Sequence, residues 1–114
     1  MPNAIKLATA ASITATGAGA AVRLNKTPLL GGQGREGILR LDAAVGGSGS
    51  IDIEGHASTG ATAPGAADAG WAKLVTLTSA SPLSQELADL PCWIRHNVKT
   101  AGTGAVTITL EGVQ

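Results

Sequence analysis

Short segments in which apolar and polar residues alternate run along much of the chain. The clearest is residues 106–110, where Val, Ile and Leu are separated by two threonines, and residues 22–24, 39–42 and 51–54 show the same two-residue period. Successive side chains of a strand point to opposite faces, so this period predicts strands with one buried face. Threonine is a typical exposed partner on such a half-buried surface.

Two further segments and three breaks complete the pattern. Residues 71–78 and 92–98 would place apolar side chains on both faces of a strand, or carry them at irregular spacing. This favours central strands that are covered on both faces. The breaks at 46–49, 60–70 and 101–104 are rich in Gly, Ser and Thr, as turns are. The last break separates two well-defined strands, so we predict a hairpin there.

One short helix is possible at Ser84–Leu90, where Ser84 could cap a turn that Pro91 ends. No helical segment is long enough for the crossovers of a parallel sheet. We therefore predict an all-β protein, an antiparallel β-sandwich or jelly-roll-like barrel of about six to eight short strands. Residues 1–19 would form an extended N-terminal arm or a first strand, and residues 20–114 a single β domain.

Composition predicts a thin hydrophobic core. The chain of 114 residues suits one domain, and its hydrophobic fraction of 44% comes mainly from Ala, Val, Leu and Ile. Trp71 and Trp93 are its only aromatic residues, although aromatic rings dominate the buried area of many small cores. We therefore expect self-association or docking to add to the stability of this chain.

Charge and hydropathy exclude several classes of partner. Eight basic and eight acidic residues give a net charge of zero, and no basic run could neutralise a row of phosphates, so a nucleic-acid partner is not expected. No stretch reaches the length of about 18–20 apolar residues that a membrane-spanning helix needs, and no membrane association is predicted. Residues 1–22 resemble a signal peptide in outline, but polar residues interrupt their apolar part.

A glycine motif and a carboxylate pair are the first candidates for a site. Gly32, Gly34 and Gly37 match the dinucleotide pattern G-x-G-x-x-G, but the alternation that follows them predicts a strand where that site needs a helix. Asp52 and Glu54 share one face of a predicted strand, and acid and base roles could be divided between them. Alternating carboxylates are also the ordinary pattern of a solvated strand face, which is the interpretation we favour.

The two histidines and the single cysteine do not complete a catalytic or metal-binding site in the sequence. His56 could join Asp52 and Glu54, but such a group has too few ligands for a metal and no nucleophile. The single Cys92 excludes an intrachain disulfide and is expected to be a packed thiol. His96 is expected to be a structural histidine. No catalytic, cofactor-binding or metal-binding residue is predicted, and no enzymatic activity.

The segments 71–78, 90–98 and 104–113 resemble small virion proteins of tailed bacteriophages in their texture, and the Ala-, Gly-, Thr- and Ser-rich composition of the remainder resembles the same group. They are similar in particular to the cement or decoration proteins on the outside of phage heads. This resemblance implies a compact β-sandwich or jelly-roll subunit that clamps neighbouring major capsid proteins as a dimer or trimer. It brings no catalytic residues.

The expected function is that of a structural virion protein, made in the host cytoplasm and placed on the outer surface of the head. Two alternatives remain. One is a tail or baseplate component of the virion. The other is a carbohydrate-binding β-sandwich, for which Trp71 and Trp93 would have to supply all of the stacking surface.

Overall fold

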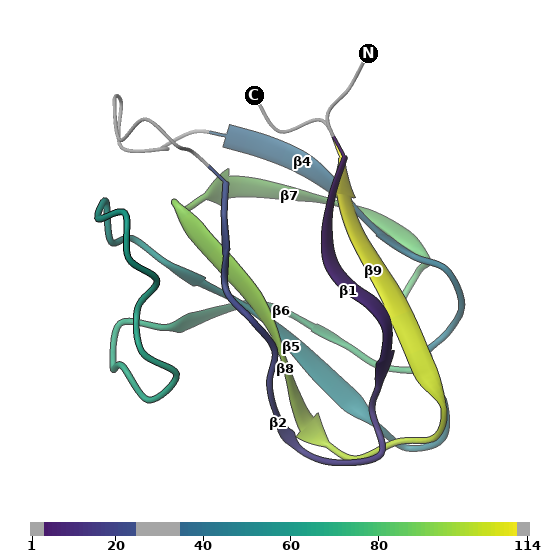
Figure 1. Ribbon diagram of the computed structural model, residues 1–114. Helices are drawn as coiled ribbons and strands as arrows, with labels where there is room; N and C mark the ends of the chain where they lie inside the picture. Colours follow the sequence, from purple (N-terminus) through teal and green to yellow (C-terminus); the bar gives the residue numbers. More distant parts are fainter. Residues whose placement is uncertain (1–3, 25–34, 112–114) are drawn as a thin grey trace.

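The computed structural model describes residues 4–24 and 35–111, and these form nine strands without a helix. The predicted all-β class is thereby confirmed (Figure 1). The strands are β1 (Ala4–Ser12), β2 (Gly17–Ala18), β3 (Val22–Arg23), β4 (Arg35–Leu41), β5 (Ser50–His56), β6 (Ala72–Leu77), β7 (Ser84–Leu90), β8 (Trp93–Thr100) and β9 (Ala105–Glu111).

The strands make two antiparallel sheets that pack face to face, which confirms the predicted sandwich. One sheet has the order β1-β9-β4-β7. The other has the order β2-β8-β5-β6, with β3 also paired to β8. In Figure 1 the long strands β1 and β9 of the first sheet lie beside each other, while β5 and β6 of the second sheet cross behind them.

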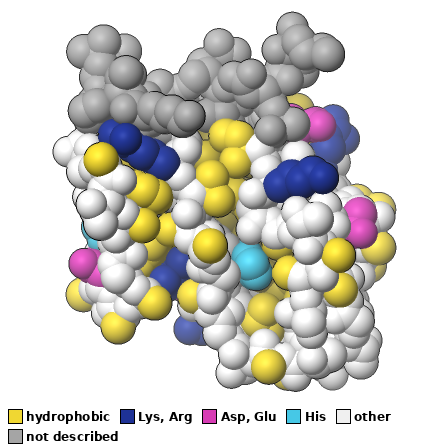
Figure 2. Space-filling model, in the orientation of Figure 1, with side chains coloured by type: hydrophobic (Ala, Val, Ile, Leu, Met, Phe, Trp, Pro, Cys, Tyr) yellow, Lys and Arg dark blue, Asp and Glu magenta, His cyan; other side chains and the backbone are white. Residues whose placement is uncertain are grey.

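Among the described residues, the hydrophobic cluster between the sheets consists of aliphatic side chains, as the composition predicts. Val106, Ile108 and Leu110 on β9 are all buried, whereas the threonines between them are partly exposed. Ile51 and Ile53 point into the same core from β5. The alternation therefore predicted the correct inner face for both strands. Figure 2 shows apolar side chains in the hollowed middle of the molecule, between the edge strands of the two sheets.

The segment Ser84–Leu90 is strand β7, so the helical interpretation is wrong. Leu87 and Leu90 are both buried although they stand three residues apart, a spacing that looks helical in the sequence. In β7 an irregular register against β4 and a positive φ of 55° at Asp89 turn both leucines to the core. A bulge thus imitates a helical period.

The predicted hairpin at 101–104 is also wrong, because β8 and β9 belong to different sheets. The connection between them packs against other loops. The N–H of Gly102 donates to the Ile13 carbonyl at 2.8 Å, and Thr103 forms an isolated bridge with Gly46. Of the two strands expected to be central, β8 is central and β6 is an edge strand. Periodicity shows which faces are covered, but not which neighbours pair.

The first residues of the described chain contribute to both sheets. Within the segment for which an arm or a first strand was predicted, residues 4–12 form β1 along β9, with irregular register between Lys6 and Ala11. At this bulge Ala10 has a φ of 46°, and its N–H donates to Thr107 Oγ1 at 2.9 Å. The chain then crosses to the second sheet, where β2 and β3 pair with β8.

Candidate functional site: the network beneath loop 57–71

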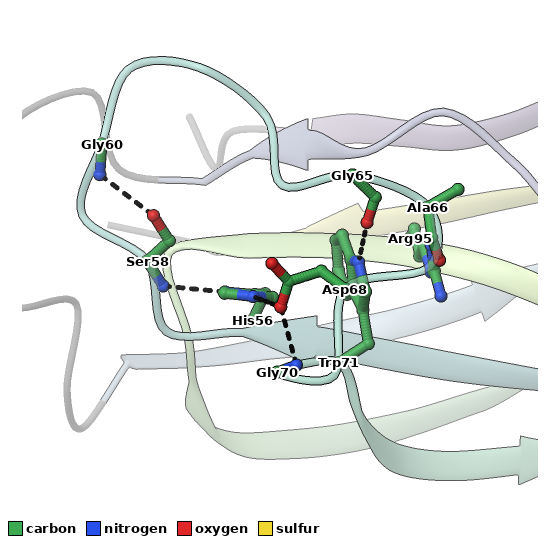
Figure 3. A network of polar contacts seen from close by, with 9 residues as sticks. All are labelled: His56, Ser58, Gly60, Gly65, Ala66, Asp68, Gly70, Trp71 and Arg95. Atoms are coloured by element: carbon green, nitrogen blue, oxygen red, sulfur yellow. Dashed lines mark hydrogen bonds and ion pairs between the residues drawn. The ribbon is translucent and has the colours of Figure 1, made fainter.

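The outer face of the five-stranded sheet carries the polar residues singled out in the sequence. Asp52, Glu54 and His56 point away from the core on β5, because Ile51 and Ile53, which occupy the alternate positions, point into it. They share a face as predicted, but they do not act on a common group. Each carboxylate or ring has its own partner, and the connection from β5 to β6, residues 57–71, folds over this face (Figure 3).

The central contact is a buried ion pair between Glu54 and Arg95. Arg95 Nε donates to Glu54 Oε1 at 2.8 Å, and only 6% of the Arg95 side chain and 11% of the Glu54 side chain are exposed. Asn97 Nδ2 donates to both carboxylate oxygens, at 3.2 and 3.3 Å. A buried ion pair is tolerated only when such additional hydrogen bonds satisfy its charges. Strands β5 and β8 supply these groups because Glu54 and Arg95 are directly paired.

Arg95 and Trp71 hold the loop onto the sheet. The Arg95 guanidinium lies 4.1 Å from the centre of the Trp71 ring, and its Nη1 donates to the Ala66 carbonyl at 3.0 Å. Trp71 Nε1 donates to the Gly65 carbonyl at 2.9 Å. The backbone of the loop is therefore fixed at two adjacent carbonyls by side chains from β8 and from the residue before β6.

A second contact between the loop and β5 is made by Asp68 and His56. His56 Nε2 lies 2.9 Å from Asp68 Oδ1, and the same oxygen accepts the N–H of Gly70 at 2.7 Å. The hydrogen bond with His56 is the main cause that lowers the pKa of the Asp68 carboxyl, and the Gly70 N–H adds to it. The His56 ring also meets Trp71 edge to face, with centroids 5.2 Å apart.

The arrangement has no nucleophile activated by a base. His56 Nδ1 accepts the N–H of Ser58 at 3.0 Å, so both ring nitrogens are engaged within the loop. Ser58 Oγ itself accepts the N–H of Gly60 at 3.3 Å. Across the described ranges, no three His, Cys, Asp or Glu residues lie together as metal ligands. The polar groups of this network bond to one another and to the loop backbone, and these contacts hold the loop in place.

The remaining candidates lie inside the sandwich or at the edge of the described chain. Cys92 is 1% exposed, which agrees with a packed thiol. His96 is buried on the inner face of β8, where burial lowers its pKa and a hydrogen bond with the Leu7 backbone partly opposes this. Of the glycine motif, Gly32 and Gly34 lie outside the described residues, and Gly37 is a buried position of β4, so a strand follows the motif as predicted.

Sequence reasoning missed most of the network. Arg95 and Asn97 alternate with the inward residues of β8, so the sequence could have predicted that both side chains lie on the outer face. The pairing of Arg95 with Glu54 was not, because nothing in the sequence fixes which strands are neighbours. Asp68 and Trp71 lie in or next to a glycine-rich break and carried no signal of a contact with β5.

Comparisons of the chain with protein-family models, with curated proteins and with solved structures give no significant match. In the part of the chain that the structure describes, no helix is long and apolar enough to cross a membrane. What the protein does is therefore inferred from its own residues.

Proposed function

We propose that this chain is a structural interaction protein, a capsid cement or decoration protein of a tailed bacteriophage that binds the major capsid protein and stabilises the head. It would be made in the host cytoplasm, form a dimer or trimer and occupy the outer surface of the head. The observation that carries the interaction role is loop 57–71, a long connection without regular structure that a dedicated network nevertheless fixes in place.

Such a loop needs an explanation because most connections between strands have about 4–6 residues. Long ordered loops usually serve recognition. Here a buried ion pair, a cation–π contact and a histidine–carboxylate contact fix one loop conformation before any partner arrives. A preorganised loop loses little entropy on binding, which favours affinity.

The exposed surface of the loop suits contact with another protein. Residues 59–63 and 65–70 are exposed, and Asp68 is the only charged residue between His56 and Lys73. The centres of protein interfaces are similarly depleted in charge. Small side chains also permit a partner's backbone to approach closely. This supports a protein partner, and the resemblance of the C-terminal segments to phage cement proteins supports the capsid as that partner.

The carbohydrate alternative loses support from the placement of the two tryptophans. Trp93 is 6% exposed, so its ring is not available for stacking. Trp71 is covered by the Arg95 guanidinium on one face, and its indole N–H is bonded to Gly65. The tail or baseplate alternative remains a competing outcome of the experiments below.

Binding to purified virion parts tests the proposal. We expect the chain to co-sediment with heads and not with tails, and to occur in virions at a copy number comparable to that of the major capsid protein. Co-sedimentation with tails alone would favour the alternative. The absence of the chain from virions, or only a few copies per particle, would overturn the cement proposal.

Two matched variants locate the contact surface. Ala61→Glu places a charge on the exposed part of the loop, and Ala88→Glu makes the same change at an exposed position of β7, in the other sheet. Ala61→Glu should weaken head binding more than about tenfold, because an unpaired charge would be buried at the contact. Ala88→Glu should leave binding unchanged. Loss with Ala88→Glu alone would place the interface on the other sheet.

A further inference from the structure

His56 contacts both arms of loop 57–71. As the last residue of β5, it accepts the Ser58 N–H at Nδ1, 3.0 Å away, on the arm that leaves the sheet. Through Nε2 it contacts Asp68 at 2.9 Å on the arm that returns. Figure 3 shows the ring between these two partners. An amide N–H can only donate, so Nδ1 must accept, and the proton of the neutral ring lies on Nε2.

The ring is also packed from the side. A Cβ at Gly70 would lie 2.4 Å from His56 Nε2, so the returning arm passes directly over the imidazole. Trp71 meets the ring edge to face. The His56 side chain is only 14% exposed, which keeps it in this position between the arms.

The charged groups around His56 come from loop 57–71 and from four strands, and most of them are paired with one another. Asp68 of the loop faces it directly. Glu54, two residues earlier on the same face of β5, is paired with Arg95 of β8, which lies over Trp71. On β6, Lys73 pairs in register with Glu54, and on β3 the Arg23 guanidinium reaches the Thr59 carbonyl at 3.5 Å. The negative charge in contact with the ring is therefore the Asp68 carboxylate.

We propose that His56 is a pH-sensitive clip of the loop, which holds both arms when neutral and releases the Ser58 arm, while keeping the Asp68 arm, when protonated. A proton on Nδ1 turns the acceptor of the Ser58 N–H into a second donor, so that two N–H groups face each other. The same proton strengthens the contact with Asp68, which becomes a hydrogen bond between two opposite charges. The loop would thus open from one end only. This device acts in the isolated chain and does not depend on the identity of the partner.

Amide exchange measured by NMR tests the clip. Exchange rates are measured between about pH 8 and about pH 5, the range over which the charge of histidine changes. They are corrected for the intrinsic pH dependence of amide exchange. The protection of the Ser58 amide should fall roughly five- to tenfold, as expected for the loss of one hydrogen bond. The fall should follow the titration of the His56 ring, while the Gly70 amide keeps its protection. The His56 ring nitrogen shifts should report the Nε2–H tautomer at the upper end of the range.

Two variants make the assignment specific. His56→Asn keeps a carbonyl acceptor near the position of Nδ1 but does not titrate, so the Ser58 amide should stay protected at both ends of the pH range. Asp68→Asn keeps an oxygen that can accept from His56 Nε2 but removes the negative charge, so the returning arm should be held less firmly and the Gly70 amide should lose protection at the lower pH. The dispersion of the amide spectrum at the upper pH shows that each variant is folded.

Three results would overturn the proposal. The first is Ser58 protection that stays constant while the His56 ring titrates. The second is an equal pH response in His56→Asn, which would assign the response to another group such as His96. The third is simultaneous release of Ser58 and Gly70, which would mean that the loop opens as a whole.

Discussion

At the residue scale, the most consequential contact is the buried pair of Glu54 and Arg95. Both charges lie under loop 57–71 with little access to water. Removing one partner leaves the other buried and uncompensated, which costs far more than the net contribution of the pair. The pair also positions the loop, because Arg95 binds both Trp71 and the Ala66 carbonyl.

Arg95→Met should therefore lower the free energy of unfolding by about 3–5 kcal/mol in urea denaturation. The matched control is Arg40→Met, which breaks the exposed pair of Arg40 with Glu111 and should cost no more than about 1 kcal/mol. Combining Arg95→Met with Glu54→Leu should restore much of the loss. Equal effects of the two single changes would contradict the buried character of the first pair.

The two faces of β9 provide a second comparison. Ile108 is fully buried, so Ile108→Ala should cost about 2–5 kcal/mol through lost transfer energy and a cavity. Thr107 looks like an ordinary exposed position in the sequence, but its hydroxyl accepts the Ala10 N–H. Thr107→Ala should accordingly cost about 0.5–1.5 kcal/mol, more than the negligible cost of a simple surface change.

Thr109→Ala on the same outer face is the control for Thr107→Ala, and its effect should stay within about 0.5 kcal/mol. Chemical denaturation of the three variants side by side should rank their losses in the order Ile108, Thr107, Thr109. A loss at Thr109 as large as that at Thr107 would show that the bulge contact with Ala10 contributes nothing specific.

At the element scale, bulges decide the form of the edge strands. In β7 the register shift and the positive φ of Asp89 bring Leu87 and Leu90 to the same face. In β1 the corresponding device is the bulge at Ala10. Such irregularities also make an edge a poor template for unwanted pairing with other strands. A sequence rule with a strict period of two cannot describe either strand.

The left-handed conformation of Asp89 can be tested directly. Asp89→Val should lower the free energy of unfolding by about 1–2 kcal/mol, because a β-branched residue strongly disfavours positive φ. Ala88→Val, one residue earlier on the exposed side of the same strand, should have little effect. If thermal and urea unfolding give the two variants the same stability, Asp89 does not hold this conformation in solution.

At the scale of the whole molecule, His96 links the two sheets. It lies on the inner face of β8 with its ring against Gly19, where a Cβ would come within 2.1 Å of Cε1. Its ring also meets the backbone of Leu7 on β1 in the opposite sheet. A neutral ring fits this place, and a charged one would have to be desolvated between the sheets.

Stability should therefore fall in mild acid. Burial lowers the pKa of His96 from its usual value of 6.5, so below pH 6.5 the unfolded chain takes up a proton that the folded chain does not yet bind. The free energy of unfolding should decrease as the pH drops from 6.5 toward the lowered pKa. Urea denaturation at a series of pH values measures this slope.

His96→Gln should flatten the slope, because the variant lacks the group whose pKa differs between the folded and unfolded chain. The carboxyl of Asp68 does not interfere, since its contribution is present above pH 3.8 and is lost only as the pH falls through its lowered pKa. A slope that persists unchanged in His96→Gln would contradict the role of this histidine.

The sequence by itself determined the all-β class and the inner and outer faces of β5 and β9. It did so because the alternation of apolar and polar residues is a local property, read from neighbours in the chain. The same alternation predicts that Asp52, Glu54 and His56 share one face of a strand, and they do. Local pattern therefore predicted which residues of a strand could form a site.

Only the tertiary structure decided which strands are neighbours and what covers them. The pairing of β5 with β8 brings Glu54 to Arg95, and the fold of loop 57–71 brings Asp68 to His56. Strand order depends on contacts between residues far apart in the chain, whose free energy no local pattern records. For the same reason, the spacing of the β7 leucines imitates a helix and the 101–104 turn imitates a hairpin, although their partner strands exclude both.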